Sequence, residues 1–263
     1  MEQKGVRLQK VMADAGIASR REAERMIADG LVRVNGEVVT RLGATMVPGQ
    51  DRLEVAGSTV GLSRPAQREV WALYKPKRVV STLNDPQGRP TLKDFFPKTA
   101  LRLFPVGRLD YDAEGLILVT NDGDLAQRVA HPSHSVPKTY LVKVKGTVDA
   151  VALARHARAP VIDGKPRRPI KARVLHGVND KTWVEMILKE GIHHHIKKFF
   201  DDLGYPVLKL KRFQIGSINL GDMMPGQCRK LTQAEVAELL AHTAEHPSAK
   251  KPARTKPNSL PLE

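Results

Sequence analysis

The chain has few of the features that mark secreted, membrane-spanning or cysteine-based proteins. Cys228 is its only cysteine, which excludes an internal disulfide and any zinc site built from cysteines. No run reaches about 18 consecutive apolar residues, the length that a membrane span needs, and residues 1–5 lack the apolar core of a secretion signal. We therefore expect a cytoplasmic protein that makes no membrane contact.

Acidic side chains are outnumbered by basic ones. The 263 residues include 43 Lys and Arg but only 28 Asp and Glu, which gives a formal net charge of +15 and a pI near 10.0. Such an excess favours a polyanionic partner over a neutral or acidic small molecule, and nucleic acid over an anionic membrane surface. The length allows a sizeable core, and we expect two domains rather than one.

Residues 7–55 have the pattern of a compact module with two helices and a small sheet. Apolar spacing over 7–15 predicts a short amphipathic helix. The capping-box pattern from Ser19 to Glu22 predicts a second helix, which begins at residue 20 and ends near residue 30. The pair Asn35-Gly36, between strand-like runs, predicts a β-hairpin, and residues 51–55 alternate as a further strand.

Basic side chains concentrate on this module. The predicted RNA contacts are Arg7, Lys10, Arg20, Arg21 and Arg25. On short neighbouring helices their charges can add into one patch that faces phosphates, although a solvated basic face gives the same pattern. The segments Leu8 to Val11, Ala18 to Ala23 and Val32 to Gly36 resemble the S-four-type RNA-binding domain. The resemblance implies that this module binds RNA.

A cluster of charged residues lies between Gly107 and Gly115, ahead of the apolar run 116–120. The run is short and branched enough for a buried strand, and residues 121–123 predict a turn after it. The cluster holds Arg108, Asp110, Asp112 and Glu114. Carboxylates beside buried strands need partners, so such a cluster indicates chemistry or metal binding more often than packing. The pattern permits a catalytic carboxylate, metal-dependent phosphodiester chemistry or a solvated acidic turn.

The order of motifs around this cluster resembles a known enzyme family. Gly-Arg-Leu-Asp at 107–110, Gly-Leu at 115–116 and Thr-Asn-Asp-Gly at 120–123 resemble the signature of the RsuA/RluB pseudouridine synthases, which modify ribosomal RNA. The resemblance extends from residue 7 to about residue 240. It implies that Asp110 is the nucleophile and that the isomerisation of uridine needs no cofactor. Sequence does not decide between covalent attack on sugar or base and elimination from the sugar.

A second motif, Lys138-Thr139-Tyr140, matches the family's Lys-x-Tyr on a strand. By this resemblance Tyr140 is a catalytic residue that supports the flipped target base by stacking. Lys138 and Arg108 are predicted RNA contacts. Tyr140 also alternates with Val142 and Val144, which fits an aromatic side chain packed on a sheet face. Both interpretations of Tyr140 stay open at this point.

The third motif departs from the family pattern. Where the family has Glu-Gly-Arg-Asn-Arg-Gln-Val-Arg-Arg-Met-Phe, residues 190–200 have Glu-Gly-Ile-His-His-His-Ile-Lys-Lys-Phe-Phe. Lys197 aligns with the arginine that pairs with the catalytic aspartate, so Lys197 is expected in the catalytic site with its charge kept and the bidentate fork lost. His194 and Lys198 occupy two other arginine positions and are predicted RNA contacts. Consecutive histidines on a helix point in different directions, so we predict no metal site.

The sequence after residue 70 is rich in strand patterns. Strands are predicted over 70–74, 138–144, 182–188 and 207–213, and helices over 193–203 and 232–241. The expected fold class is α+β: a small N-terminal α/β RNA-binding module, joined by a linker to a catalytic domain built on a mixed, largely antiparallel β-sheet with flanking helices. The expected bounds are 5–57 for the module, 58–68 for the linker, 69–241 for the catalytic domain and 242–263 for a disordered, basic, Pro-rich tail.

These patterns lead us to expect a monomeric ribosomal RNA pseudouridine synthase. Residues 80–91 favour the large-subunit, RluB-like group, so 23S rRNA or a pre-ribosomal particle is the expected partner. Small-subunit rRNA and tRNA are the alternative substrates. A non-catalytic RNA-binding or ribosome-assembly factor is the alternative function, which the altered third motif permits and the intact Asp110 and Tyr140 argue against.

Overall fold

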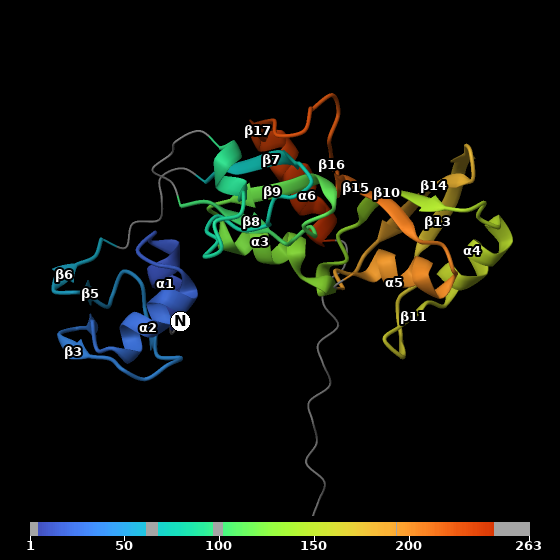
Figure 1. Ribbon diagram of the computed structural model, residues 1–263. Coiled ribbons are helices and arrows are strands. Elements are labelled where there is room, and N and C mark those ends of the chain that lie inside the picture. Colours follow the sequence, from blue (N-terminus) through green and yellow to red (C-terminus); the bar gives the residue numbers. More distant parts are fainter. Residues whose placement is uncertain (1–4, 62–67, 97–101, 193, 245–263) are drawn as a thin grey trace, which may run out of the picture.

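The computed structural model describes residues 5–61, 68–96, 102–192 and 194–244. Its ribbon has a small N-terminal module at one end and a larger sheet domain beside it (Figure 1). Residues 62–67 of the predicted linker and residues 245–263 of the predicted tail lie outside the described residues, as does His193.

The N-terminal module contains the helices and the hairpin that the sequence predicts. Helix α1 spans Leu8–Asp14 and helix α2 spans Arg20–Ala28, and a sheet of order β3-β2-β5-β6 packs against them. Ser19 is the N-cap of α2, and its hydroxyl accepts a hydrogen bond of 3.0 Å from the Glu22 amide. Asn35 and Gly36 have φ of 53° and 86°, as the tight hairpin requires. The strands are β1 (Val6–Arg7), β2 (Val32–Val34), β3 (Glu37–Val38), β4 (Thr45–Met46), β5 (Leu53–Val55) and β6 (Ser58–Thr59).

The sheet of this module extends further than the composition of residues 57–65 indicates. Ser58 and Thr59, expected in the linker, form strand β6 and pair with β5. Ala56 and Gly57 have φ of 48° and 80°, so the chain turns back on itself directly after β5. The small residues 56–59 therefore form the turn and the second strand of another hairpin, and not a linker.

The larger domain is a mixed and mostly antiparallel sheet, as predicted. Its strand order is β13-β14-β10-β15-β9-β7-β17, with β8 on β9 and β16 on β15, and only the β9–β15 pair is parallel among the described residues. The strands are β7 (Val70–Lys75), β8 (Phe104–Val106), β9 (Glu114–Thr120), β10 (Lys138–Lys145), β13 (Lys171–Gly177), β14 (Lys181–Leu188), β15 (Val207–Ile215), β16 (Ile218–Asn219) and β17 (Cys228–Lys230). A separate ribbon joins β11 (Val161–Ile162) to β12 (Lys165–Pro166).

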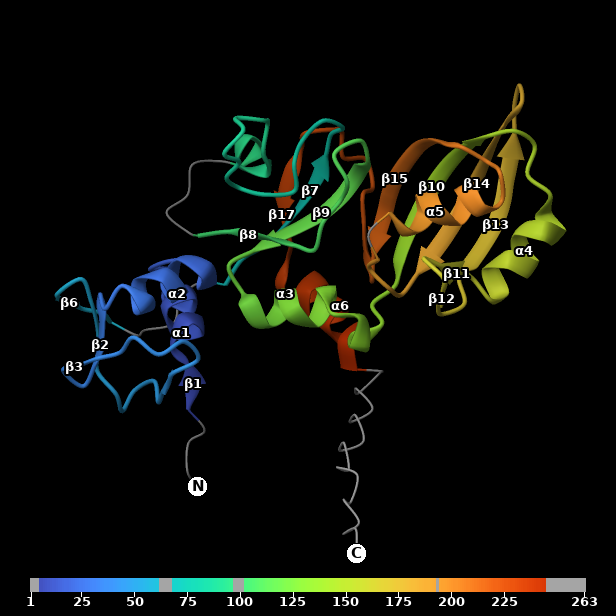
Figure 2. The same cartoon turned by 60° about the horizontal axis from the view of Figure 1, so that its bottom comes forward.

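Helices cover the two faces of this sheet at different places (Figure 2). Strand β9 is buried along its whole length, and its side chains alternate between two cores. Leu116 and Leu118 join the core under α3 (Gly123–Ala130) and α6 (Gln233–Ala244). Ile117 and Val119 join the core that contains α4 (Ala150–Arg158) and α5 (His195–Asp202).

Two of these helices differ from the sequence prediction. Residues 121–123 do not simply close β9 with a turn, because Asp122 is the N-cap of α3 and accepts from the amides of Asp124 and Leu125 at 3.0 and 3.1 Å. Helix α6 begins with the predicted capping box, in which the Thr232 and Glu235 side chains and amides exchange hydrogen bonds. It continues past residue 241 to Ala244, so residues 242–244, which were expected in the tail, are helical.

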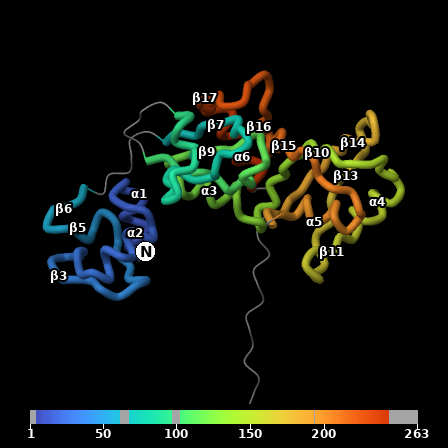
Figure 3. The backbone as a smooth tube through the Cα atoms, viewed as in Figure 1, coloured from blue at the N-terminus to red at the C-terminus, as the bar shows by residue number. Residues whose placement is uncertain are grey.

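The β9–β15 contact joins segments that are far apart in the sequence (Figure 3). Gly115 in β9 lies against the backbone of Arg212 in β15. A Cβ atom at residue 115 would lie 2.2 Å from the Arg212 carbonyl oxygen, and φ there is +116°. Glycine is therefore required where the two halves of the sheet meet, immediately behind the charged loop 107–113.

Candidate active site

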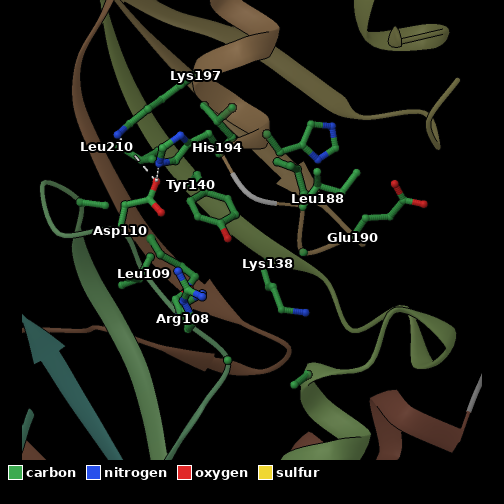
Figure 4. Close-up of a pocket in the computed structure, with 18 of the residues that line it drawn as sticks. Arg108, Leu109, Asp110, Lys138, Tyr140, Leu188, Glu190, His194, Lys197 and Leu210 are labelled. Carbon is green, nitrogen blue, oxygen red and sulfur yellow. Dashed lines mark hydrogen bonds and ion pairs between the residues drawn. The ribbon is translucent and has the colours of Figure 1, made fainter. Parts of the chain in front are cut away.

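A cavity of about 310 Å³ lies where the loop before β9 faces β10, β15 and the start of α5 (Figure 4). It is lined by most of the site residues that the sequence predicts in the larger domain: Arg108, Asp110, Lys138, Tyr140, His194 and Lys197. Lys198 does not line it. Predicted site residues from three separate stretches of sequence thus converge on one cavity.

The backbone around Asp110 is held by hydrogen bonds from three residues in two other segments. The Ser81 hydroxyl accepts from the Leu109 amide at 3.0 Å and donates to the Leu109 carbonyl at 2.7 Å. The Arg78 amide donates to the Tyr111 carbonyl at 2.7 Å. The Arg212 guanidinium donates to the Arg108 carbonyl at 3.3 Å. The loop is thus fixed on both sides of the carboxylate, which suits a group that must hold one orientation.

Asp110 faces two basic side chains, those of Lys197 in α5 and of His194, the residue that caps this helix. Its Oδ2 lies 3.6 Å from His194 Nε2 and 3.7 Å from Lys197 Nζ, and the Asp110 side chain is 22% exposed. Lys197 lies closer to Asp112, with Nζ at 2.7 Å from both carboxylate oxygens. This hydrogen bond lowers the pKa of Asp112. The lysine therefore lies within reach of both carboxylates but binds Asp112 more closely.

The three carboxylates of the cluster do not point toward one common centre. Asp112 is mostly exposed and binds Lys197, whereas the carboxylate of Glu114 is buried in β9 and lies 2.9 Å from Lys209 Nζ. Within the described residues, no three His, Cys, Asp or Glu side chains gather as ligands for a metal ion. Asp110 is the carboxylate of this cluster that lines the cavity.

Tyr140 lies in the middle of the cavity wall, beside Asp110 (Figure 4). It is half-buried and packs against the core that includes Val142 and Val144, with which it shares a face of β10. Both sequence interpretations of Tyr140 therefore describe its position, since it contacts the core and also lines the cavity. Tyr140 pairs across the sheet with Met186 and Arg212.

Lys138 lies at the end of the cavity away from Lys197 (Figure 4). Its ammonium donates to the carbonyls of Val136 and Val129 at 3.1 and 3.4 Å. Burial lowers the pKa of Lys138 to about 8, with a further contribution from Arg212. Lys138, predicted as an RNA contact, is thus a cavity residue bound to the backbone rather than part of a surface patch.

The other predicted RNA contacts divide into exposed and ion-paired groups. Exposed side chains belong to Arg7, Arg20, Arg21, Arg25 and Arg108. Lys10 instead lies 2.7 Å from Asp14 and 3.1 Å from Asp124 of α3, so it links the N-terminal module to the larger domain. The Arg102 guanidinium adds a second link by donating to the Ala18 carbonyl. Lys198 lies 2.7 Å from Asp163.

Two buried basic residues behind the loop were not singled out by the sequence. Lys75 is fully buried and donates to the carbonyls of Pro76 and Val79, each at 2.9 Å. Burial lowers its pKa to about 8. Arg212 is also buried, and its Nε donates to the Leu116 carbonyl at 2.7 Å. Neither residue could be recognised from its local pattern, because Lys75 ends an apolar strand and Arg212 lies in a strand where apolar and basic residues alternate.

A half-buried carboxylate, an aromatic ring and basic side chains around one cavity form a site suited to chemistry on a base turned out of an RNA strand. The chain belongs to the RNA pseudouridylate synthase family, whose model matches residues 69–202, and the S4 domain model matches residues 6–51. The fold class, the family and the enzyme class predicted from the sequence are confirmed: the chain is an isomerase that acts on RNA.

Relatives match most of the chain. Ribosomal large subunit pseudouridine synthase B of Bacillus subtilis (strain 168) is 40% identical over 242 residues, which cover 91% of this chain and 97% of that protein. An uncharacterised RNA pseudouridine synthase of Aquifex aeolicus (strain VF5) is 40% identical over 235 residues, covering 89% and 93%. A crystal structure of a pseudouridylate synthase is similar with a TM-score of 0.63 at 30% identity, and covers 89% of this chain and 99% of that one. In the part of the chain that the structure describes, no helix is long and apolar enough to cross a membrane.

Proposed function

We propose that this enzyme converts one or a few specific uridines of large-subunit ribosomal RNA into pseudouridine. The Bacillus subtilis relative, similar over nearly its whole length, is named for large-subunit ribosomal RNA. The net charge of +15 suits a highly charged RNA substrate. We further propose that the enzyme acts as a monomer in the cytoplasm, where ribosomal particles are assembled.

The observation that carries the proposal is the placement of Asp110 in the cavity beside the ring of Tyr140. Isomerisation breaks the bond from the sugar C1′ to N1 of uracil and forms a bond from C1′ to C5, and a proton leaves C5 while N1 gains one. A carboxylate can attack the sugar or the base, or can act as the base that starts elimination from the sugar. In this proposal Asp110 performs one of these steps, and the reaction needs no cofactor.

Tyr140 and Lys197 have supporting roles in this proposal. The detached base must turn without escaping, and the tyrosine ring offers a face on which it can stack. Lys197, 3.7 Å from the carboxylate, orients Asp110 and offsets its negative charge. A lysine does this as a point charge and cannot form the two parallel bonds of an arginine.

RNA binding is assigned mainly to the exposed arginines of α2. Arg20, Arg21 and Arg25 are exposed and available for phosphates. Arg7 and Arg108 extend this contact, whereas Lys10 and Lys198 would first have to leave their carboxylate partners. The domain bounds 5–57 and 69–241 are proposed to separate RNA binding from chemistry, with β6 added to the binding module.

The test is to map pseudouridine in ribosomal RNA from cells with and without the gene, and from cells complemented with variants. Loss of a modified position in large-subunit RNA without the gene, restored by the wild type but not by Asp110→Asn, is expected. Asp222→Asn, at an exposed carboxylate that does not line the cavity, is the matched control and should restore it. A lost position in small-subunit RNA or tRNA would correct the substrate. Full restoration by Asp110→Asn would refute the role of Asp110.

A further inference from the structure

One of the histidines before α5 reaches the carboxylate on which the proposed mechanism depends. His194 is the N-cap residue of α5 and lines the cavity. Its Nε2 lies 3.6 Å from Asp110 Oδ2, as the dashed line in Figure 4 marks. The His194 side chain is 41% exposed, so it contacts both Asp110 and solvent. Its imidazole can therefore exchange protons with water while it faces the carboxylate.

The backbone at His194 has a conformation that L-amino acids disfavour. Its φ and ψ are 56° and 25°, in the left-handed region, and no hydrogen bond from its side chain caps the helix. With this backbone the ring faces the loop that carries Asp110 and does not bond to the amides of α5.

Lys197 is the permanent cation closest to Asp110, but it binds mainly to Asp112. Lys197 Nζ lies 2.7 Å from both Asp112 oxygens and 3.7 Å from Asp110 Oδ2. An ammonium group is a compact charge, so a close contact with one carboxylate leaves a longer contact with the other. His194 and Lys197 thus face Asp110 from nearly equal distances.

We propose that His194 is a positioning residue for Asp110, and that its imidazolium form shares with Lys197 the task of orienting the carboxylate. This rests on the proposed role of Asp110. A histidine loses its charge when it is deprotonated, whereas arginine and lysine keep theirs. The rate of the chemical step is therefore expected to fall as the pH rises, and to fall less when residue 194 is an arginine.

Several other charged or titratable groups face the same cavity. The loop before β9 supplies Arg108, Asp110 and Asp112, β10 supplies Lys138 and Tyr140, and β15 supplies Arg212. The segment after β14 supplies Glu190, and α5 supplies His195 and Lys197. All of them stay in place when residue 194 alone is changed. Only a difference in rate or in pH dependence between the variants at residue 194 is therefore assigned to His194.

The experiment measures single-turnover rates at saturating RNA between pH 5.5 and 8.5 for the wild type, His194→Arg and His194→Gln. From pH 5.5 to pH 8.5, the single-turnover rate of the wild type should fall about threefold to tenfold more than the rate of His194→Arg, whose arginine carries a permanent charge. His194→Gln should be slow at every pH and should lack this difference. His176→Gln, at an exposed histidine on edge strand β13, should match the wild type.

A His194→Gln variant with the wild-type rate and pH profile would overturn the proposal. So would a variant whose defect lies wholly in RNA affinity, because that would make His194 an RNA contact. Asp110→Asn is measured in the same assay. Turnover by Asp110→Asn would refute the proposed role of Asp110, on which the role of His194 rests, whereas an inactive Asp110→Asn beside an unaffected His194→Gln would refute only the role of His194.

Discussion

The hydroxyl of Ser81 is expected to control the position of Asp110 without touching the RNA. It makes two hydrogen bonds to the backbone of Leu109, at 2.7 and 3.0 Å, and Leu109 is buried. Ser81→Ala removes both bonds and leaves an amide and a carbonyl that water reaches poorly. At about 1 to 3 kcal/mol for each unsatisfied group, and with partial relaxation of the loop, the free energy of unfolding should fall by roughly 2 to 3 kcal/mol.

The effect on the rate should be larger than the effect on binding. Asp110 follows Leu109 directly, and a displacement of about 1 Å at a reacting group can lower a rate about 10²-fold. We expect Ser81→Ala to lower the single-turnover rate at least tenfold and to leave RNA affinity nearly unchanged, because the arginines of α2 are unaffected. The variant should be assayed well below its melting temperature, so that every molecule is folded.

Two variants make this test specific. Ser81→Thr keeps a hydroxyl at the same place and should retain most of the rate. Ser58→Ala removes an exposed hydroxyl in the N-terminal module and should change neither stability nor rate. A folded Ser81→Ala enzyme that turns over at the wild-type rate would refute the reasoning, because the loop would then hold Asp110 without this hydroxyl.

Three further predictions concern other parts of the site. Tyr140→Leu should lower kcat/KM several-fold or more, since one base–aromatic stack contributes ~1–3 kcal/mol, whereas Tyr140→Phe should keep the wild-type kcat/KM. If Tyr140→Leu loses only stability, the ring has a structural role and does not support the base. Gly115→Ala should destabilise the fold severely, because the new Cβ would lie 2.2 Å from a backbone oxygen, whereas Gly61→Ala meets nothing within 4 Å and should be neutral in denaturation curves. The folded pKa of Lys75, about 8, is below its ordinary 10.5. The unfolded chain therefore binds more protons between these values, and stability should rise with pH across them in the wild type more than in Lys75→Met.

Much of the cavity could be predicted from short motifs, because each motif fixes chemistry within a few residues. Asp110, Tyr140 and Lys197 come from separate motifs, and the structure brings all of them to one cavity. The preference of Lys197 for Asp112 could not be predicted, since an alignment with an arginine position does not say which of two neighbouring carboxylates a lysine will bind. The link between Lys10 and Asp124 depends on how the two domains meet, and local patterns carry no signal for it.

The helices and strands that sequence reasoning missed have local signals that were assigned to other structures. Asp122 was expected in a turn, yet an Asp ahead of Leu125 and Val129 at helical spacing is also a helix N-terminus. Ser58 and Thr59 were expected at the start of a linker, although Gly57, which follows a strand, equally permits a hairpin. In both cases turn-forming residues are compatible with two structures, and the residues that follow decide which one forms.

The arrangement of the sheet explains why the site depends on residues outside the cavity. Asp110 comes from the half of the sheet that contains β7, β8 and β9, whereas Tyr140 and Lys197 come from β10 and α5 in the other half. The halves are joined by the short parallel pairing of β9 with β15, at Gly115 and Arg212. Arg212 also donates hydrogen bonds to the Leu116 carbonyl in β9 and to the Arg108 carbonyl in the loop. The distance between the Asp110 carboxylate and the Tyr140 ring therefore depends on this junction. There the buried Arg212 in β15, in one half of the sheet, donates hydrogen bonds to β9 and to the loop of the other half.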